Sequence, residues 1–122
     1  MIQLTRAEEE VMQVLWKLDK AFVKEILAHF PKPRPAYNTV STIIRILETK
    51  KVVAHESFGR AHRYYPMVSK QAYRVKSLNE LKQQYFAGSA TEIVSTWLQN
   101  KELSVQDIDE IKAMLTSKTK KK

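Results

Sequence analysis

Apolar residues in the first third of the chain recur with the period of a helix. Thr5 and Glu8 have the spacing of a capping box, and apolar residues then return every three or four positions as far as Leu18. This pattern predicts a helix over residues 6–17. A second, short helix follows, and it must end before Pro31 because proline cannot continue a helix.

The segment over residues 37–51 separates apolar from polar side chains along its length. Four apolar residues spaced i, i+3, i+4 and i+7 predict a third helix with one buried stripe: Val40, Ile43, Ile44 and Leu47. The opposite face is polar and carries Asn38, Ser41, Thr42, Arg45 and Thr49, with Thr39 at its margin. Such short donors and acceptors, together with one guanidinium, can approach the base edges of a duplex closely.

Two segments rich in branched and aromatic residues, 52–58 and 61–65, have the composition of strands. Gly59 and Arg60 separate them, and glycine can adopt the positive φ of a type II′ turn, so a two-residue hairpin is predicted. The hairpin register would pair Glu56 with Arg63 and His55 with Tyr64, leaving Arg60 at the exposed tip.

Helical patterns return after the hairpin, over residues 69–86, from Ser89 to about Asn100, and from Ser104 onward. The last two helices carry apolar stripes that need a partner: Ile93, Val94, Trp97, Leu98, Ile108, Ile111, Met114 and Leu115. Packing these residues against a second copy would cover more apolar area than folding them back onto a small domain. We therefore predict that this region forms a homodimer.

The excess charge of the chain is concentrated in one place. The 122 residues carry a formal net charge of +8, and residues 31–77 hold ten Lys or Arg against only Glu48 and Glu56. The surplus coincides with the third helix and the hairpin, which predicts a polyanionic partner. Because the chain has no cysteine, no charged-then-apolar leader and no long apolar run, we expect a cytoplasmic protein without membrane insertion.

Three helices followed by a hairpin are the element order of a winged helix-turn-helix, in which the third helix enters the major groove. The predicted fold is thus mainly α, with a C-terminal helical dimerisation region. The expected domains are a winged-helix DNA-binding domain over residues 1–68, a helical dimerisation region over 69–117, and a basic tail over 118–122.

The charge and the fold together predict a protein that binds double-stranded DNA, as a homodimer on an inverted repeat. The base contacts are assigned to Asn38, Thr39, Ser41, Thr42 and Arg45, with a phosphate clamp as the alternative for Arg45. The wing residues Arg60, His62 and Arg63 would contact phosphates, although Arg63 could instead pair with Glu56 and His62 could be a plain surface histidine.

A second hypothesis is a winged-helix module whose basic face binds an acidic protein partner. His29, His55 and His62 lack the spacing of a metal site, so neither a metal nor another cofactor is expected. The chain has no glycine-rich phosphate loop and no nucleophile elbow, so an enzyme is not expected either.

Several stretches carry a family resemblance that covers nearly the whole chain. They are Leu4-Thr-Arg-Ala-Glu-Glu-Glu-Val-Met, Trp16, Asn38-Thr-Val-Ser-Thr-Ile-Ile-Arg, Arg63-Tyr-Tyr-Pro, and Leu98-Gln-Asn-Lys-Glu-Leu-Ser-Val-Gln-Asp-Ile-Asp-Glu-Ile. With these marks the chain resembles the penicillinase and methicillin-resistance repressor family of winged-helix bacterial transcription regulators.

The resemblance implies a homodimeric repressor on palindromic operators, controlled by a membrane sensor-protease system that cleaves the dimerisation region. The family's cleaved Asn-Phe pair corresponds here to Thr96-Trp97. A basic residue and an arginine common in the family's groove helix correspond to Asn38 and Ser41, so the operator need not be the family's. Copper-responsive relatives carry a C-terminal cysteine cluster that this chain lacks, which argues against copper sensing.

Overall fold

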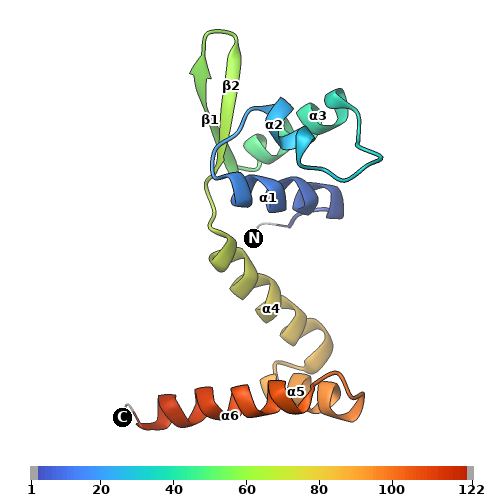
Figure 1. Ribbon diagram of the computed structural model, residues 1–122, viewed down its shortest axis with the longest axis vertical. Coiled ribbons are helices and arrows are strands. Elements are labelled where there is room, and N and C mark those ends of the chain that lie inside the picture. Colours follow the sequence, from blue (N-terminus) through green and yellow to red (C-terminus); the bar gives the residue numbers. More distant parts are fainter. Residues whose placement is uncertain (1–2, 121–122) are drawn as a thin grey trace. The chain divides into compact units, whose positions relative to one another are not determined.

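The computed structural model describes residues 3–120, and its contacts divide the chain into two compact units, one up to Val75 and one from Lys76 onward. The first unit contains three helices and a hairpin, and the second is helical (Figure 1). The structure is mainly helical with one small sheet, as the sequence predicts. Among the described residues, no helix is both long enough and apolar enough to span a bilayer.

The first unit is built around three helices, α1 (Arg6–Leu18), α2 (Val23–Ala28) and α3 (Tyr37–Thr49). The predicted capping box begins α1, because Thr5 accepts from the backbone of Glu8 while the Glu8 carboxylate accepts from the backbone of Thr5. The apolar stripes of the three helices meet in one core, whose largest fully buried side chains are Met12, Leu15, Ile26, Ile44 and Leu47.

The hairpin consists of β1 (Val53–Phe58) and β2 (Ala61–Pro66), paired in the predicted register. Glu56 lies opposite Arg63, and Gly59 has a φ of +61° in the turn. A backbone bridge between Ala21 and Tyr64, with N···O distances of 2.9 and 2.8 Å, fastens β2 to the segment between α1 and α2. The hairpin is thereby held beside the helices.

Helix α4 (Lys70–Phe86) crosses the division between the units, and its first turn belongs to the first unit. There the Tyr73 hydroxyl donates to Glu9 of α1 at 2.5 Å, and the Trp16 indole donates to the carbonyl of Val68 at 2.8 Å. These contacts hold the chain after β2 against α1.

The second unit continues with α5 (Ala90–Gln99) and α6 (Val105–Lys120). Ser89 caps α5, and Ser104 and Asp107 cap each other's backbone at the start of α6. Helix α6 extends past residue 117, so part of the expected basic tail, including Lys118, is helical. The remainder of that tail, residues 121–122, lies outside the described residues.

Candidate nucleic-acid interface

Helix α3 buries its apolar stripe and leaves its polar face open. Val40, Ile44 and Leu47 are fully buried. On the other face Asn38, Thr39, Thr42 and Arg45 are exposed and Ser41 is half-buried. The structure therefore brings together the five residues assigned to base contact on a single accessible helix face.

Arg45 is held loosely. Its Nε donates to the Ser41 carbonyl one turn earlier at 3.4 Å, a long hydrogen bond. Its terminal nitrogens have no hydrogen-bond partner among the described residues, and the residue is exposed. A guanidinium in this state can form the paired hydrogen bonds that guanine accepts.

A groove of about 320 Å³ separates the start of α3 from the tip of the hairpin. Three basic side chains and three hydroxyl-bearing side chains line it: Lys24, Arg60, His62, Tyr37, Ser41 and Tyr64. No carboxylate lines this groove, and Arg60 has no ion-pair partner among the described residues. Such a groove can take a backbone phosphate beside the helix that faces the bases.

Two histidines, His55 and His62, lie on the hairpin face toward α3, and one of them bonds to that helix. The imidazole of His55 bonds to the Glu48 carboxylate of α3, and the ring of His62 stacks on His55 with centroids 4.0 Å apart. Tyr64 packs edge-on against both rings. Burial, reinforced by the charge of Glu48, raises the pKa of the Tyr64 phenol above its ordinary value of 10.0, so it stays neutral.

The other hairpin face carries a second charge cluster around Glu56. The Lys20 amine lies 2.8 Å from one carboxylate oxygen and the Arg63 guanidinium 3.4 Å from the other. The hydrogen bond and charge of Lys20, joined by Arg63, hold the pKa of the Glu56 carboxyl below its usual value. Of the two roles considered for Arg63, the structure displays the pairing with Glu56.

Lys50, at the end of α3, is exposed, but its amine is paired within the protein. Its amine lies 2.7 Å from the buried carboxylate of Glu8 and donates to the Gln3 carbonyl at 3.0 Å. Burial alone would raise the pKa of Glu8, but the hydrogen bonds from Lys50 and Thr5 and the Lys50 charge outweigh it and lower that pKa. Lys50 thus locks α3 onto α1.

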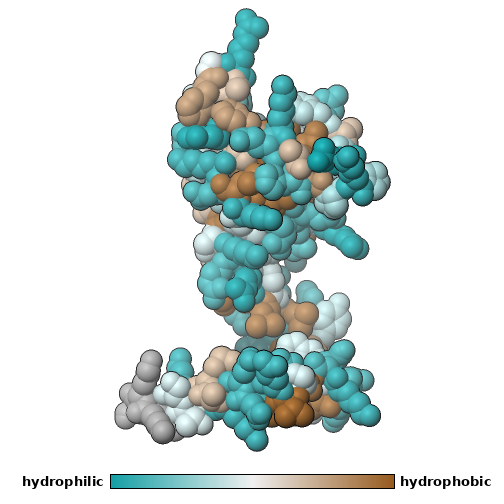
Figure 2. All heavy atoms as spheres, viewed as in Figure 1, coloured by the Kyte–Doolittle hydropathy of each residue, from teal (hydrophilic) through white to brown (hydrophobic). Residues whose placement is uncertain are grey.

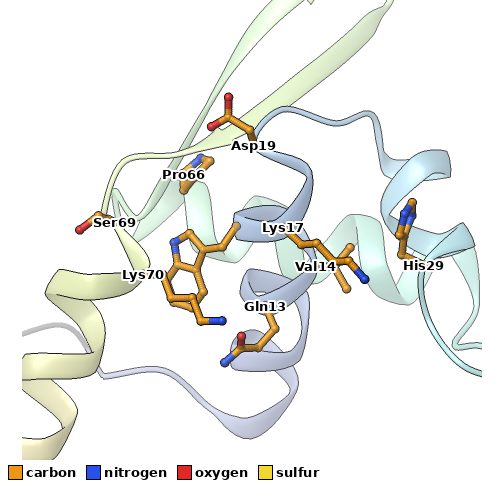
Figure 3. A pocket seen from close by; sticks show the side chains of 9 residues that line it. Gln13, Val14, Lys17, Asp19, His29, Pro66, Ser69 and Lys70 are labelled. Atoms are coloured by element: carbon orange, nitrogen blue, oxygen red, sulfur yellow. The ribbon is translucent and has the colours of Figure 1, made fainter.

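A larger hollow, of about 650 Å³, lies along α1 and is lined by polar and apolar side chains, including Trp16, Lys17, Asp19, His29 and Lys70. Figure 3 shows Asp19 and His29 well apart on different elements, so its carboxylate and its imidazole do not converge. Within residues 3–120, no three His, Asp or Glu side chains come together in a way that could hold a metal ion.

The second unit exposes much of its apolar surface, visible as brown patches in Figure 2. Of the eight residues assigned to dimerisation, Ile93 is buried, Ile108 and Ile111 are half-buried, and the others are exposed: Val94, Trp97, Leu98, Met114 and Leu115. Helix α4 adds Leu78, Leu81 and Tyr85, the last with 75% of its surface exposed. Thr96 and Trp97 of the candidate cleavage site lie exposed on α5.

Sequence reasoning did not identify three features of this surface. Lys24 and Tyr37 were not assigned to it, because their place in the groove depends on how α2 and the hairpin tip approach each other. Lys20 is distant in sequence from Glu56, and only the Ala21 bridge brings it there. The local excess of basic residues over residues 31–77 includes neither Lys20 nor Lys24, so it gave no signal for either of them.

Known proteins resemble this chain over most of its length. Residues 4–117 match the family described as penicillinase repressor. The chain is 26% identical over 114 residues to the penicillinase repressor of Bacillus licheniformis, spanning 93% of this chain and 89% of that protein. It is 20% identical over 117 residues to the methicillin resistance regulatory protein MecI of Staphylococcus aureus, spanning 95% of each.

A solved structure has a fold similar to that of the first unit. The DNA-binding domain of the repressor BlaI aligns with 58% of this chain and 88% of that domain, with a TM-score of 0.52 and 29% identity.

Proposed function

Because the chain belongs to the penicillinase repressor family and is a transcriptional repressor, we propose that it acts as a homodimer bound to inverted-repeat operator DNA. The family consists of repressors and not of enzymes. Cytoplasmic location is part of the proposal, since the operator would be chromosomal.

The observation that carries the proposal is the open polar face of α3, anchored by fully buried Val40, Ile44 and Leu47. A helix held in this way can enter a major groove without exposing apolar surface. Asn38, Thr39, Ser41, Thr42 and Arg45 would then contact base edges. The likeness of the first unit to the DNA-binding domain of BlaI supports this use of the helix.

The groove beside α3 supplies the sequence-independent part of binding. Lys24, Arg60 and His62 would surround one backbone phosphate, while Tyr37 donates a hydroxyl hydrogen bond to it. Because each neutralised phosphate releases counterions, this contribution must weaken as salt is added. The groove sets the register of α3 on the duplex, and α3 selects the sequence.

The exposed apolar residues of the second unit support the homodimer. Within residues 76–118, Ile93 is the one hydrophobic residue that is buried, with 8% of its surface exposed. A unit of this size needs a larger core, and a second copy can supply it. A twofold dimer would place two α3 helices on half-sites one helical turn, or a multiple of it, apart.

Release of the operator by a membrane sensor-protease system is the regulatory part of the proposal. The Thr96-Trp97 bond lies within α5, among the residues proposed to form the dimer. Cutting there would separate α6 from the rest of the subunit and weaken the dimer. Incubation with the membrane fraction of induced cells should yield a fragment ending at Thr96, identified by mass, and persistence of the intact chain would contradict this part alone.

The experiment that tests the function is selection of duplexes from a random library by the full-length protein, followed by titration at several salt concentrations. We expect an inverted repeat, bound at least about a thousand-fold more tightly than a shuffled duplex. A duplex with one half-site replaced should lose most of this preference. Failure to enrich any sequence, together with salt-insensitive capture of acidic proteins, would instead support an interaction module.

A further inference from the structure

The hairpin uses both carboxylates of the basic stretch as counter-ions, one on each of its faces. Glu48 pairs with His55 on the face toward α3. Glu56 pairs with Lys20 and Arg63 on the face away from it. Glu56 therefore pairs with two cations, one on the wing and one beside its base.

The geometry gives each oxygen of Glu56 its own cation. Lys20 Nζ lies 2.8 Å from Oε1, and Arg63 Nη2 lies 3.4 Å from Oε2. Arg63 is placed opposite Glu56 by the strand register, while Lys20 is brought there by the bridge at Ala21. Both cations are thus directed to this carboxylate by the backbone.

The three side chains are only partly covered, with exposed fractions of 45% for Lys20, 39% for Glu56 and 34% for Arg63. Ion pairs in such exposed positions contribute little to stability. If the carboxylate were removed, both cations could turn toward a nearby polyanion, because both side chains are partly exposed.

Aromatic rings position the cations without neutralising them. The Arg63 guanidinium lies over the ring of Phe58, 4.8 Å from its centroid, and Lys20 lies 5.8 Å from the centroid of Tyr65. Glu56 is consequently the charge that decides whether these two cations are available to phosphates.

We propose that Glu56 is a specificity-determining residue, which pairs with Lys20 and Arg63 and so limits the number of phosphates that the wing neutralises. Phosphate contacts strengthen binding to every sequence, whereas selectivity depends on the difference between operator and unrelated DNA. By limiting the number of phosphate contacts, Glu56 keeps the affinity for unrelated DNA low. The inference rests on the DNA-binding function proposed above.

The test is the full-length Glu56→Gln variant, which keeps the shape of the side chain and removes its charge. On a duplex of random sequence, we expect affinity at about 100 mM salt to rise roughly three- to tenfold, and the slope of log affinity against log salt to steepen by about one per released cation in each subunit. Binding to the selected operator should rise less, so the ratio of the two affinities falls.

Two controls separate this effect from a change of net charge. Glu10→Gln removes an equal charge from an exposed position on α1, where the partner is Arg6, and should leave the salt slope unchanged. The triple variant Glu56→Gln/Lys20→Gln/Arg63→Gln removes the cations as well, and should lose the gain. Circular dichroism melting confirms that each variant is folded at the assay temperature.

The outcomes distinguish failure of this inference from failure of the function. If the unmodified protein shows no salt-dependent preference for any duplex, the proposed function is wrong. If it shows that preference, but Glu56→Gln leaves the salt slope and the affinity ratio unchanged, only the role of Glu56 is wrong. Retention of the gain in the triple variant, or an equal gain in Glu10→Gln, would also overturn it.

Discussion

Basic side chains of α3, its C-terminal end and the hairpin are of two kinds, those paired with carboxylates of the protein and those without such a partner among the described residues. Lys50 and Arg63 are paired with carboxylates. Arg45 forms one long backbone hydrogen bond, and Arg60 lines the groove. Whether a cation can contact DNA therefore depends on whether a carboxylate of the protein already pairs with it, and not only on its position.

Replacing Arg45 by Ala should reduce operator preference more than general affinity. Loss of a paired contact to guanine corresponds to about 1–3 kcal/mol of discrimination. Binding of the selected operator and of a shuffled duplex should be titrated in parallel. Arg6→Ala is the matched control, because that side chain is 95% exposed on α1. An equal loss on both duplexes would show that Arg45 contacts phosphate instead.

Replacing Lys50 by Met should lower the free energy of unfolding at pH 7 by about 1–2 kcal/mol, because it leaves the buried carboxylate of Glu8 without its charged partner. The pKa of Glu8 is lowered in the folded protein, so this contribution is complete above the ordinary value of 4.5 and disappears as the pH falls through the folded pKa.

The measurement is urea unfolding of both proteins at pH 7 and near pH 3, where the difference should shrink. Lys51→Met serves as the control, because Lys51 has no ion-pair partner among residues 3–120. A difference that stays constant over this pH range would contradict the assigned role of Glu8.

At the scale of elements, the sequence predicts what depends on local periodicity and turn chemistry. The stripe of α3 and the register of the hairpin follow from apolar spacing and from Gly59, and both are confirmed. The groove and the position of Lys20 depend on contacts between distant segments, which periodicity does not encode. The end of α6 was missed because a run of lysines resembles a frayed terminus.

Replacing Gly59 by Ala should destabilise the hairpin turn. The position has open space around it but a φ of +61°, which costs a residue with a β-carbon about 1 kcal/mol. We expect a lower free energy of unfolding and, because Arg60 is displaced, a weaker affinity for all duplexes. Ser57→Ala, on an extended part of the same hairpin, should change neither quantity, and an equal stability of the two variants would refute this assignment.

At the scale of the whole molecule, the two units differ in how they cover their apolar side chains. The first unit has a buried core of its own, whereas the second leaves most of its large apolar side chains exposed. The first unit buries the side chains of three helices together with Val52 and Val53. The second leaves Trp97 with 45% of its surface exposed. Stability of the first unit should accordingly depend little on protein concentration, whereas that of the second should depend on it strongly.

Trp97→Ala should weaken self-association, because the proposed dimer buries this side chain and truncating a buried tryptophan commonly costs about 3–5 kcal/mol. Sedimentation over a range of concentrations would reveal a shift from dimer to monomer. Gln99→Ala, an exposed polar change on the same helix, should leave the dimer intact. Unchanged sedimentation of the tryptophan variant would remove this residue from the interface.

The backbone bridge between Ala21 and Tyr64 has a consequence for local opening of the wing. Two strands alone are marginally stable in water, so the hairpin depends on this attachment at its base. The amide protons of Ala21 and Tyr64 should exchange with deuterium only when the first unit opens as a whole, whereas those near the tip should exchange through local fraying. Amide exchange would thus be slowest at the bridge and become faster toward Arg60, so the wing would be rigid at its base and mobile at its tip.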